Sequence, residues 1–176
     1  MKKLISLLLA VCLVLGSALC GALAEENMDC KADHFSFTLP GQWLSVTPED
    51  DPTTTYYYKE EVQSIRGGYL MASYENNSIG EDQMEYVQDY YEGIIEGFKQ
   101  MSADQDAYTE DITVASCPAK FIRYNLDKNG TIYQVPSAVI MIKGNVLLLM
   151  YLNSSVDDAE AETIFRGIVD TVTYHD

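Results

Sequence analysis

Hydrophobic and polar positions alternate in the stretch "HFSFTL", residues 34–39. Phe35, Phe37 and Leu39 then share one face, a pattern that predicts a half-buried strand ending in the turn "PGQW". Two later stretches, "TTTYYYKE" and "GGYLMASYEN", are rich in aromatic and β-branched residues and are joined by a charged loop. This composition is typical of strands, so we expect the two to form a hairpin.

A helical period follows, with apolar residues at steps of three and four: Met84, Val87, Tyr91, Ile94, Ile95 and Phe98. Ser78 and Glu81 have the spacing of a capping box at its start. The opposite side carries a stripe of four like charges, Glu85, Asp89, Glu92 and Glu96. Like charges at this spacing cost a few tenths of a kcal/mol each, so the stripe is either a solvated face or a docking surface for something cationic.

The second half of the chain predicts strands at "DITVAS" and "CPAKFIRYNL", and Asn129-Gly130 is a strong hairpin signal. A calcium loop at Asp127, Asn129 and Thr131 is the competing interpretation. It fails because Gly130 is in the fourth position rather than the sixth, and no glutamate stands at the twelfth. We therefore expect no metal at this turn.

The stretch "SAVIMIKGNVLLLMYL", residues 137–152, contains two apolar runs around Gly144-Asn145, which predicts another hairpin. Both runs are apolar at every position, so these strands need cover on both faces. Ser155 can cap a last helix, whose buried stripe would be Ala161, Ile164, Phe165, Ile168, Val169 and Val172. The order of strands, helix, strands, helix predicts an α+β fold: a three-layer α/β/α sandwich with a mostly antiparallel central sheet.

The first residues have the form of an export signal. Lys2 and Lys3 precede a long apolar run that ends in "ALA" at 22–24, a small-residue cleavage site before the acid Glu25. We expect residues 1–24 to be a signal peptide and residues 25–176 to be one secreted globular domain without a transmembrane span. A lipid anchor at Cys20 is the alternative, although Ser17 and Leu19 stand in the reverse of the order that a lipobox expects.

The chain is strongly acidic, with a formal net charge of −16. Cleavage would remove two of the 11 basic residues and none of the 27 acidic ones, giving about −18. Such a charge repels the phosphate backbone of nucleic acids and anionic lipid surfaces. The expected partner is instead another extracytoplasmic protein or a small ligand.

The cleaved chain keeps Cys30 and Cys117, which are either a disulfide or two separate small apolar residues. No CxxC motif is present, and His34 and His175 are the only histidines, so neither metal binding nor a Ser-His-Asp device is indicated. No cofactor motif occurs. Close carboxylate pairs are inevitable with this many acids, so a carboxylate-based hydrolase has no specific support.

Three consecutive tyrosines offer one candidate binding surface. Alternation places Tyr56 and Tyr58 on one face of a strand and Tyr57 on the other. These rings either fill an interface between sheet and helix or form an exposed strip that suits sugar stacking or the strand edge of a partner.

Over residues 33–174 the chain resembles the PsbP-like fold, which includes the secreted DcrB-type bacterial domains. The resemblance lies in the order of "FSFTLPGQW", the helix after "GGYLMASYENN", the hairpin "YNLDKNGTIYQVPSAVIMIKGNVLLLMYL" and the closing "AETIFRGIVDTVTY". It implies the α/β/α fold and a non-enzymatic accessory or binding role, and it supplies no catalytic residues to transfer. The function expected is a secreted interaction module of the bacterial envelope or exterior. The alternatives are a small-molecule or glycan binder that uses the tyrosines and, less favoured, a hydrolase.

Overall fold

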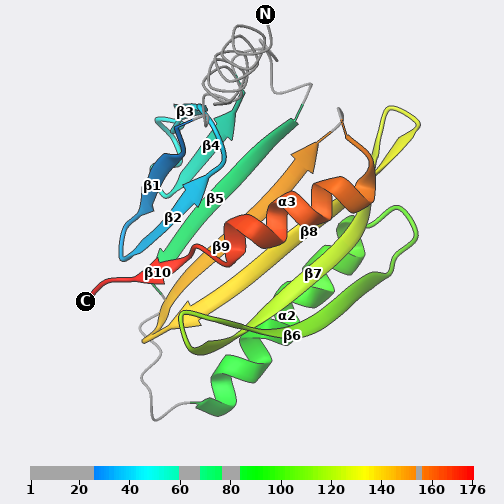
Figure 1. Cartoon of the computed structure of the whole chain (residues 1–176). Coiled ribbons are helices and arrows are strands. Elements are labelled where there is room, and N and C mark those ends of the chain that lie inside the picture. Colours follow the sequence, from blue (N-terminus) through cyan, green and yellow to red (C-terminus); the bar gives the residue numbers. More distant parts are fainter. Residues whose placement is uncertain (1–25, 60–67, 77–83, 154–155) are drawn as a thin grey trace, which may run out of the picture.

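The computed structural model describes residues 26–59, 68–76, 84–153 and 156–176 (Figure 1). The strands and helices are β1 (Met28–Ala32), β2 (Phe35–Leu39), β3 (Leu44–Val46), β4 (Thr54–Tyr58), β5 (Gly68–Asn76), α2 (Met84–Met101), β6 (Ala107–Val114), β7 (Cys117–Lys128), β8 (Thr131–Ile142), β9 (Asn145–Asn153), α3 (Asp158–Val169) and β10 (Thr173–Tyr174). The predicted signal peptide and the predicted caps Ser78, Glu81 and Ser155 lie outside the described residues. Asp157 caps α3, because its side chain accepts a hydrogen bond from the backbone N–H of Glu160 at 2.9 Å.

The strands form two antiparallel sheets. Seven of them pair in the order β3-β4-β5-β9-β8-β7-β6, and β2 pairs with both β1 and β10 in a small second sheet. The expected pairing of the two tyrosine-rich strands is present as β4 with β5. The predicted α+β class with a large antiparallel sheet and two helices is therefore confirmed, whereas the small sheet was not predicted.

Two tight turns show how the hairpins of the second half close. Asn129 and Gly130 both have positive φ, 57° and 81°, and the N–H of Gly130 donates to Asp127 Oδ1 at 2.7 Å. The next turn is Lys143-Gly144, with φ of 52° and 78°. The predicted turn Gly144-Asn145 is thus wrong by one residue, because Asn145 already pairs with Ile142 as the first residue of β9.

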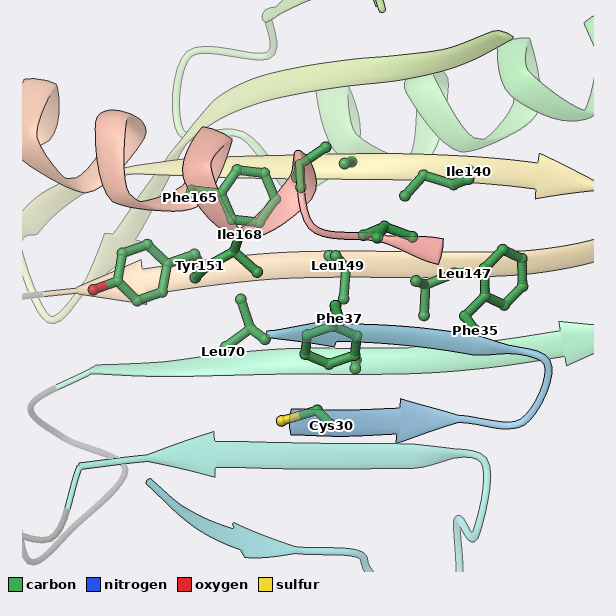
Figure 2. Packing of buried hydrophobic residues seen from close by; sticks show 14 of the residues in the cluster. Cys30, Phe35, Phe37, Leu70, Ile140, Leu147, Leu149, Tyr151, Phe165 and Ile168 are labelled. Carbon is green, nitrogen blue, oxygen red and sulfur yellow. The ribbon is translucent and has the colours of Figure 1, made fainter. Parts of the chain in front are cut away.

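One face of the large sheet is covered by α3 together with the small sheet. Phe35, Phe37 and Cys30 of the small sheet, and Phe165 and Ile168 of α3, are almost completely buried in one cluster with residues of β5, β8 and β9. Figure 2 shows these side chains gathered between the small sheet, α3 and the strands beneath them. The aromatic rings of α3 and β9 are stacked here, with the centroids of Phe165 and Tyr151 6.4 Å apart.

The opposite face carries α2. Its Tyr91 and Phe98 are buried with Ile122 and Tyr124 of β7, and α2 makes its closest approach to β6 and β7. Successive β8 residues alternate between the two clusters, for example Val139 on the α2 face against residue 140 on the α3 face. This accounts for the uninterrupted apolar runs in the sequence, because β8 and β9 need partners on both faces.

Ion pairs among four charged side chains link α3 to the β6 end of the sheet. The Arg166 side chain donates to Glu110 of β6 at 2.7 Å and to Glu162 at 2.9 Å, and Arg123 of β7 donates to Glu162 at 2.7 Å. The Arg166 guanidinium also lies 3.9 Å from the ring centroid of Phe121. Burial opposes ionisation of Glu162, but the two arginines more than offset it and lower the pKa of this carboxyl.

Candidate functional site

The three consecutive tyrosines lie on β4 and divide between the two faces of the sheet, as the alternation predicts. Tyr57 is 4% exposed, belongs to the cluster under the small sheet and contacts Phe37 edge-on at 5.7 Å. Burial raises the pKa of the Tyr57 hydroxyl far above its ordinary value. Tyr57 is therefore a core residue and has no surface to offer a ligand.

Tyr56 and Tyr58 are half-buried and face the α2 side of the sheet. Tyr58 is paired with Leu44 of β3, and Tyr56 is paired with Val46 on one side and Met71 of β5 on the other. Paired residues of antiparallel strands share a face. All of these side chains, with Tyr69, consequently lie together, and we name them the open sheet face: Leu44, Val46, Tyr56, Tyr58, Tyr69 and Met71.

The open sheet face is apolar and only partly covered. Leu44 is 43% exposed and Val46 is 47% exposed, and the other four side chains are half-buried. Tyr69 and Tyr56 contact edge to face at 5.5 Å, and burial is the larger reason that the pKa of Tyr69 is raised. Among the described elements α2 approaches β6 and β7, at the other end of the sheet, so it leaves β3 and β4 without a helix (Figure 1).

The acidic stripe of α2 lies on the exposed side of that helix. Asp89, Glu92 and Glu96 are exposed, whereas the Glu85 side chain is outside the described residues. Glu92 accepts a hydrogen bond from Gln88, one turn earlier on the same helix, at 3.0 Å. The side of α2 that turns toward β5 is marked by Tyr90, whose hydroxyl donates to Glu75 at 2.9 Å. The stripe is thus the outer, hydrated side of a helix that packs through its apolar side.

Cys30 and Cys117 are separate free thiols, so the alternative of a disulfide is not what the structure shows. Cys30 is buried on β1 beside Tyr57 of β4, and Cys117 begins β7. Four strand spacings separate β4 from β7, roughly 19 Å, against the Cα separation of about 7 Å that a disulfide tolerates. Burial raises the pKa of the Cys30 thiol to about 11, which is the behaviour of an unreactive core residue.

The two histidines contact each other beside the pairing of β2 with β10, which joins residues distant in the sequence and was not predicted. His175 Nε2 lies 2.6 Å from the Oγ of Ser36 on β2, and the Thr173 hydroxyl is within 3.2 Å of the same nitrogen. His34 Nδ1 is 3.0 Å from the carbonyl oxygen of His175. These contacts lie on the exposed outer side of the small sheet and hold β10 to β2. Within the described ranges, no three His, Cys, Asp or Glu residues are grouped to hold a metal ion.

A groove of about 340 Å³ runs along α3. Its lining is mostly apolar and comes from α3, from the end of β2 and from the residue before β1: Asn27, Thr38, Pro40, Thr163, Ile164, Gly167, Ile168 and Thr171. The N–H of Thr38 donates to the Thr171 hydroxyl at 2.8 Å, and that hydroxyl donates to the Ile168 carbonyl at 2.6 Å. These lining groups therefore use their hydrogen-bonding capacity within the protein.

Comparison with known proteins places the fold. No family model matches this chain, and no curated relative does. Among solved structures, the cyanobacterial PsbP protein (CyanoP) of Synechocystis superposes with a TM-score of 0.62 at 13% identity, covering 89% of this chain and 97% of that one. A crystal structure of a Bacteroides thetaiotaomicron protein gives a TM-score of 0.54 at 15% identity, covering 87% of this chain and 49% of that one. The predicted PsbP-like fold is confirmed, and at such identities the likeness concerns the fold.

None of the helices in the described part of the chain has the length and apolarity that a membrane span needs.

Proposed function

We propose that this protein is exported and works outside the cell membrane as a non-enzymatic accessory module that binds another protein through the open sheet face. The observation that carries the proposal is the contiguous apolar surface from β3 to β5, on which Leu44 and Val46 each leave more than two fifths of their surface in water. Apolar surface exposed in one continuous patch, unlike single exposed residues, marks an interaction site. Half-buried tyrosines beside it suit the same role, because the ring contributes apolar area and the hydroxyl a hydrogen bond.

The export part of the proposal rests on the sequence of residues 1–24. The intact mass of the protein from its native host tests it: a chain that begins at Glu25 supports release, and one that begins at a diacylated Cys20 supports a lipid anchor. We also infer a three-layer arrangement in which α2 covers one face of the large sheet, and α3 covers the other together with the small sheet. The separation of the buried residues into two clusters supports it.

A non-enzymatic role is supported by the surroundings of the polar groups. The contact between Ser36 and His175 lies on an exposed sheet surface, whereas nucleophilic catalysis needs a base held by a third group beside an enclosed oxyanion site. The glycan alternative is weakened because Tyr57 is buried, and because Leu44, Val46 and Met71 give the surface an aliphatic character.

Site-specific crosslinking in the native host tests the binding surface. A photoreactive benzoylphenylalanine replaces Tyr58 on the open sheet face in one strain and Tyr108 in another. Tyr108 is the matched control because it is a tyrosine on the distant strand β6 and is 48% exposed. We expect a discrete protein adduct from position 58 and none from position 108. Absence of an adduct at 58, or equal adducts at both positions, would contradict the proposal.

A further inference from the structure

The strand β3 forms the outer boundary of the open sheet face, and it is an unusual edge. Among the strands that the structure describes, it stands first in the order and pairs with β4 alone. Each of its three residues, Leu44, Ser45 and Val46, is exposed. An edge strand presents backbone N–H and C=O groups that another extended chain can bind. Here the edge also adjoins apolar side chains that would continue the surface of an added strand.

The loop after β3 determines which charge such a strand should carry. Glu49, Asp50 and Asp51 are consecutive and exposed, directly beyond the Val46 end of the edge. Asp51 has a structural task, because it accepts a hydrogen bond from the Thr53 hydroxyl at 2.8 Å. Glu49 and Asp50 are exposed in the loop between β3 and β4, three and four residues after Val46, which places their charges near that end of the edge. A second copy of this chain would bring a strongly negative net charge to the pairing, and this like-charge repulsion disfavours a second copy as the occupant.

The opposite end of β3 has a different character. Leu44 is paired with Tyr58, the last residue of β4, and the next residue of the chain is Lys59, whose Nζ lies 5.6 Å from the Trp43 ring centroid. Lys59 keeps its positive charge in this contact, but it is a single charge at the Leu44 end, against the consecutive acids Glu49, Asp50 and Asp51 at the Val46 end. The edge is therefore apolar along its length and acidic at one end.

We propose that β3 accepts an extended, basic segment of a partner polypeptide as an eighth strand of the large sheet. Alternate apolar side chains of that segment lie against Leu44 and Val46, and its lysine or arginine side chains face Glu49 and Asp50. Main-chain hydrogen bonds supply the attachment, and the side chains select the partner, as in other cases of strand addition. The inference deepens the proposed function, on which it rests, by naming the class of partner and the manner of binding.

The test uses a defined probe. A fluorescent ten-residue peptide carries alternating valine and threonine with two lysines at each end, and its counterpart carries glutamates in place of the lysines. Anisotropy titration of residues 25–176 should show the basic peptide binding at least tenfold more tightly than the acidic one, and more weakly as salt rises. In the nitrogen-15 NMR spectrum the largest shifts should fall on β3 and the loop after it, with cross-strand contacts between β3 and the peptide.

Two double variants with the same change of net charge separate the loop from general electrostatics. Glu49→Lys with Asp50→Lys should weaken binding of the basic peptide at least tenfold. Glu92→Lys with Glu96→Lys, on the outer side of α2, should weaken it less than threefold, since those carboxylates are distant from the edge. Val46→Asp is the third variant. It should also abolish binding, while its thermal unfolding temperature stays within a few degrees of the wild-type value.

The outcomes distinguish this inference from the proposed function. Equal loss in both double variants, or NMR shifts at β6 or on the outer side of α2, would overturn it. Concentration-dependent pairing of β3 with a second copy would also overturn it, since the occupant would then be this chain itself. If the basic peptide does not bind at millimolar concentration but the crosslink at position 58 still forms, the inference of strand addition is rejected. The proposed function of the open sheet face as an interaction surface is then retained. Loss of both results would remove both proposals.

Discussion

The two edge strands of the seven-stranded sheet differ in length and in charge. At one edge β6 is eight residues long, pairs along its whole length with β7, and carries Glu110 and Asp111 in its middle. Both acids form ion pairs, with Arg166 of α3 and with Lys120 of β7. At the other edge β3 has three exposed residues without a charged side chain, and its two larger side chains are apolar.

The difference shows that one sheet can protect one edge and leave the other available. Charged residues on an edge strand disfavour the pairing of further chains, and β6 follows this rule. Within the described part of the chain, β3 is protected by its short length and by the neighbouring acidic loop, which disfavours negatively charged chains and not basic ones. Selective exposure of this kind is expected of a binding edge, whereas an unselective apolar edge would aggregate.

The largest expected effect is a difference in stability between truncating a tyrosine on the buried face of β4 and truncating one on its open face. Tyr57→Ala should lower the free energy of unfolding by about 3–5 kcal/mol, because it leaves a cavity between β4 and Phe37. Tyr58→Ala, on the adjacent residue, should lower it by much less, since that side chain is already partly exposed to water. Urea unfolding followed by tryptophan fluorescence measures both. Equal losses would show that the open sheet face is packed like a core.

A smaller effect separates the two edges. Arg166→Met keeps the apolar stem of the side chain but leaves Glu110 and Glu162 without their shared guanidinium. We expect a loss of about 1.5–3 kcal/mol, the range for hydrogen bonds to charged groups, and a smaller loss at high salt. Val46→Lys at the β3 edge should change stability by no more than about 0.5 kcal/mol.

Arg166→Lys controls for charge, because it keeps the positive charge and loses the planar fork that reaches two carboxylates. Its loss should fall between that of Arg166→Met and zero. The comparison of the edges fails if Val46→Lys proves as destabilising as Arg166→Met, since β3 would then contribute packing that its exposure does not indicate.

The elements that the sequence predicts correctly are those whose signal is local. The helical period from Val87 to Phe98 and the alternation from Phe35 to Leu39 arise from one face being buried, and each is visible within a dozen residues. The small sheet was missed because β1 contains Asp29 and Lys31 and has little hydrophobic contrast. Only its long-range pairing with β2, and that of the two-residue β10 with the same strand, makes it a sheet.

The candidate site divides in the same way. Strand alternation suffices to place Tyr57 opposite Tyr56 and Tyr58, but it does not say which face receives a helix. That depends on where α2 crosses the sheet, and it crosses at the β6 and β7 end. The contact between Ser36 and His175 was likewise beyond prediction, because it joins residues 139 positions apart through the pairing of β2 with β10.

The smallest expected effect concerns the turn that closes the β6 edge. Ala115 and Ser116 connect β6 to β7 with φ of 48° and 65°, although neither is a residue that favours positive φ. The turn Asn129-Gly130 also has positive φ at both residues, and its residue types favour that conformation, so of these two turns only this one was predicted.

Ser116→Gly removes the cost of positive φ in the folded state, about 1 kcal/mol. Part of this gain is lost, because glycine increases the conformational entropy of the unfolded chain. We expect a gain of about 0.5 kcal/mol, measured by calorimetry as a rise of about 1–2 °C in Tm. Gly130→Ser is the reverse substitution in the matched turn and should lower Tm by a similar amount. If Ser116→Gly instead lowered Tm, the Ser116 side chain would have to stabilise the turn by more than its backbone conformation costs. The edge strand β6 would then be stabilised by this turn as well as by its pairing with β7.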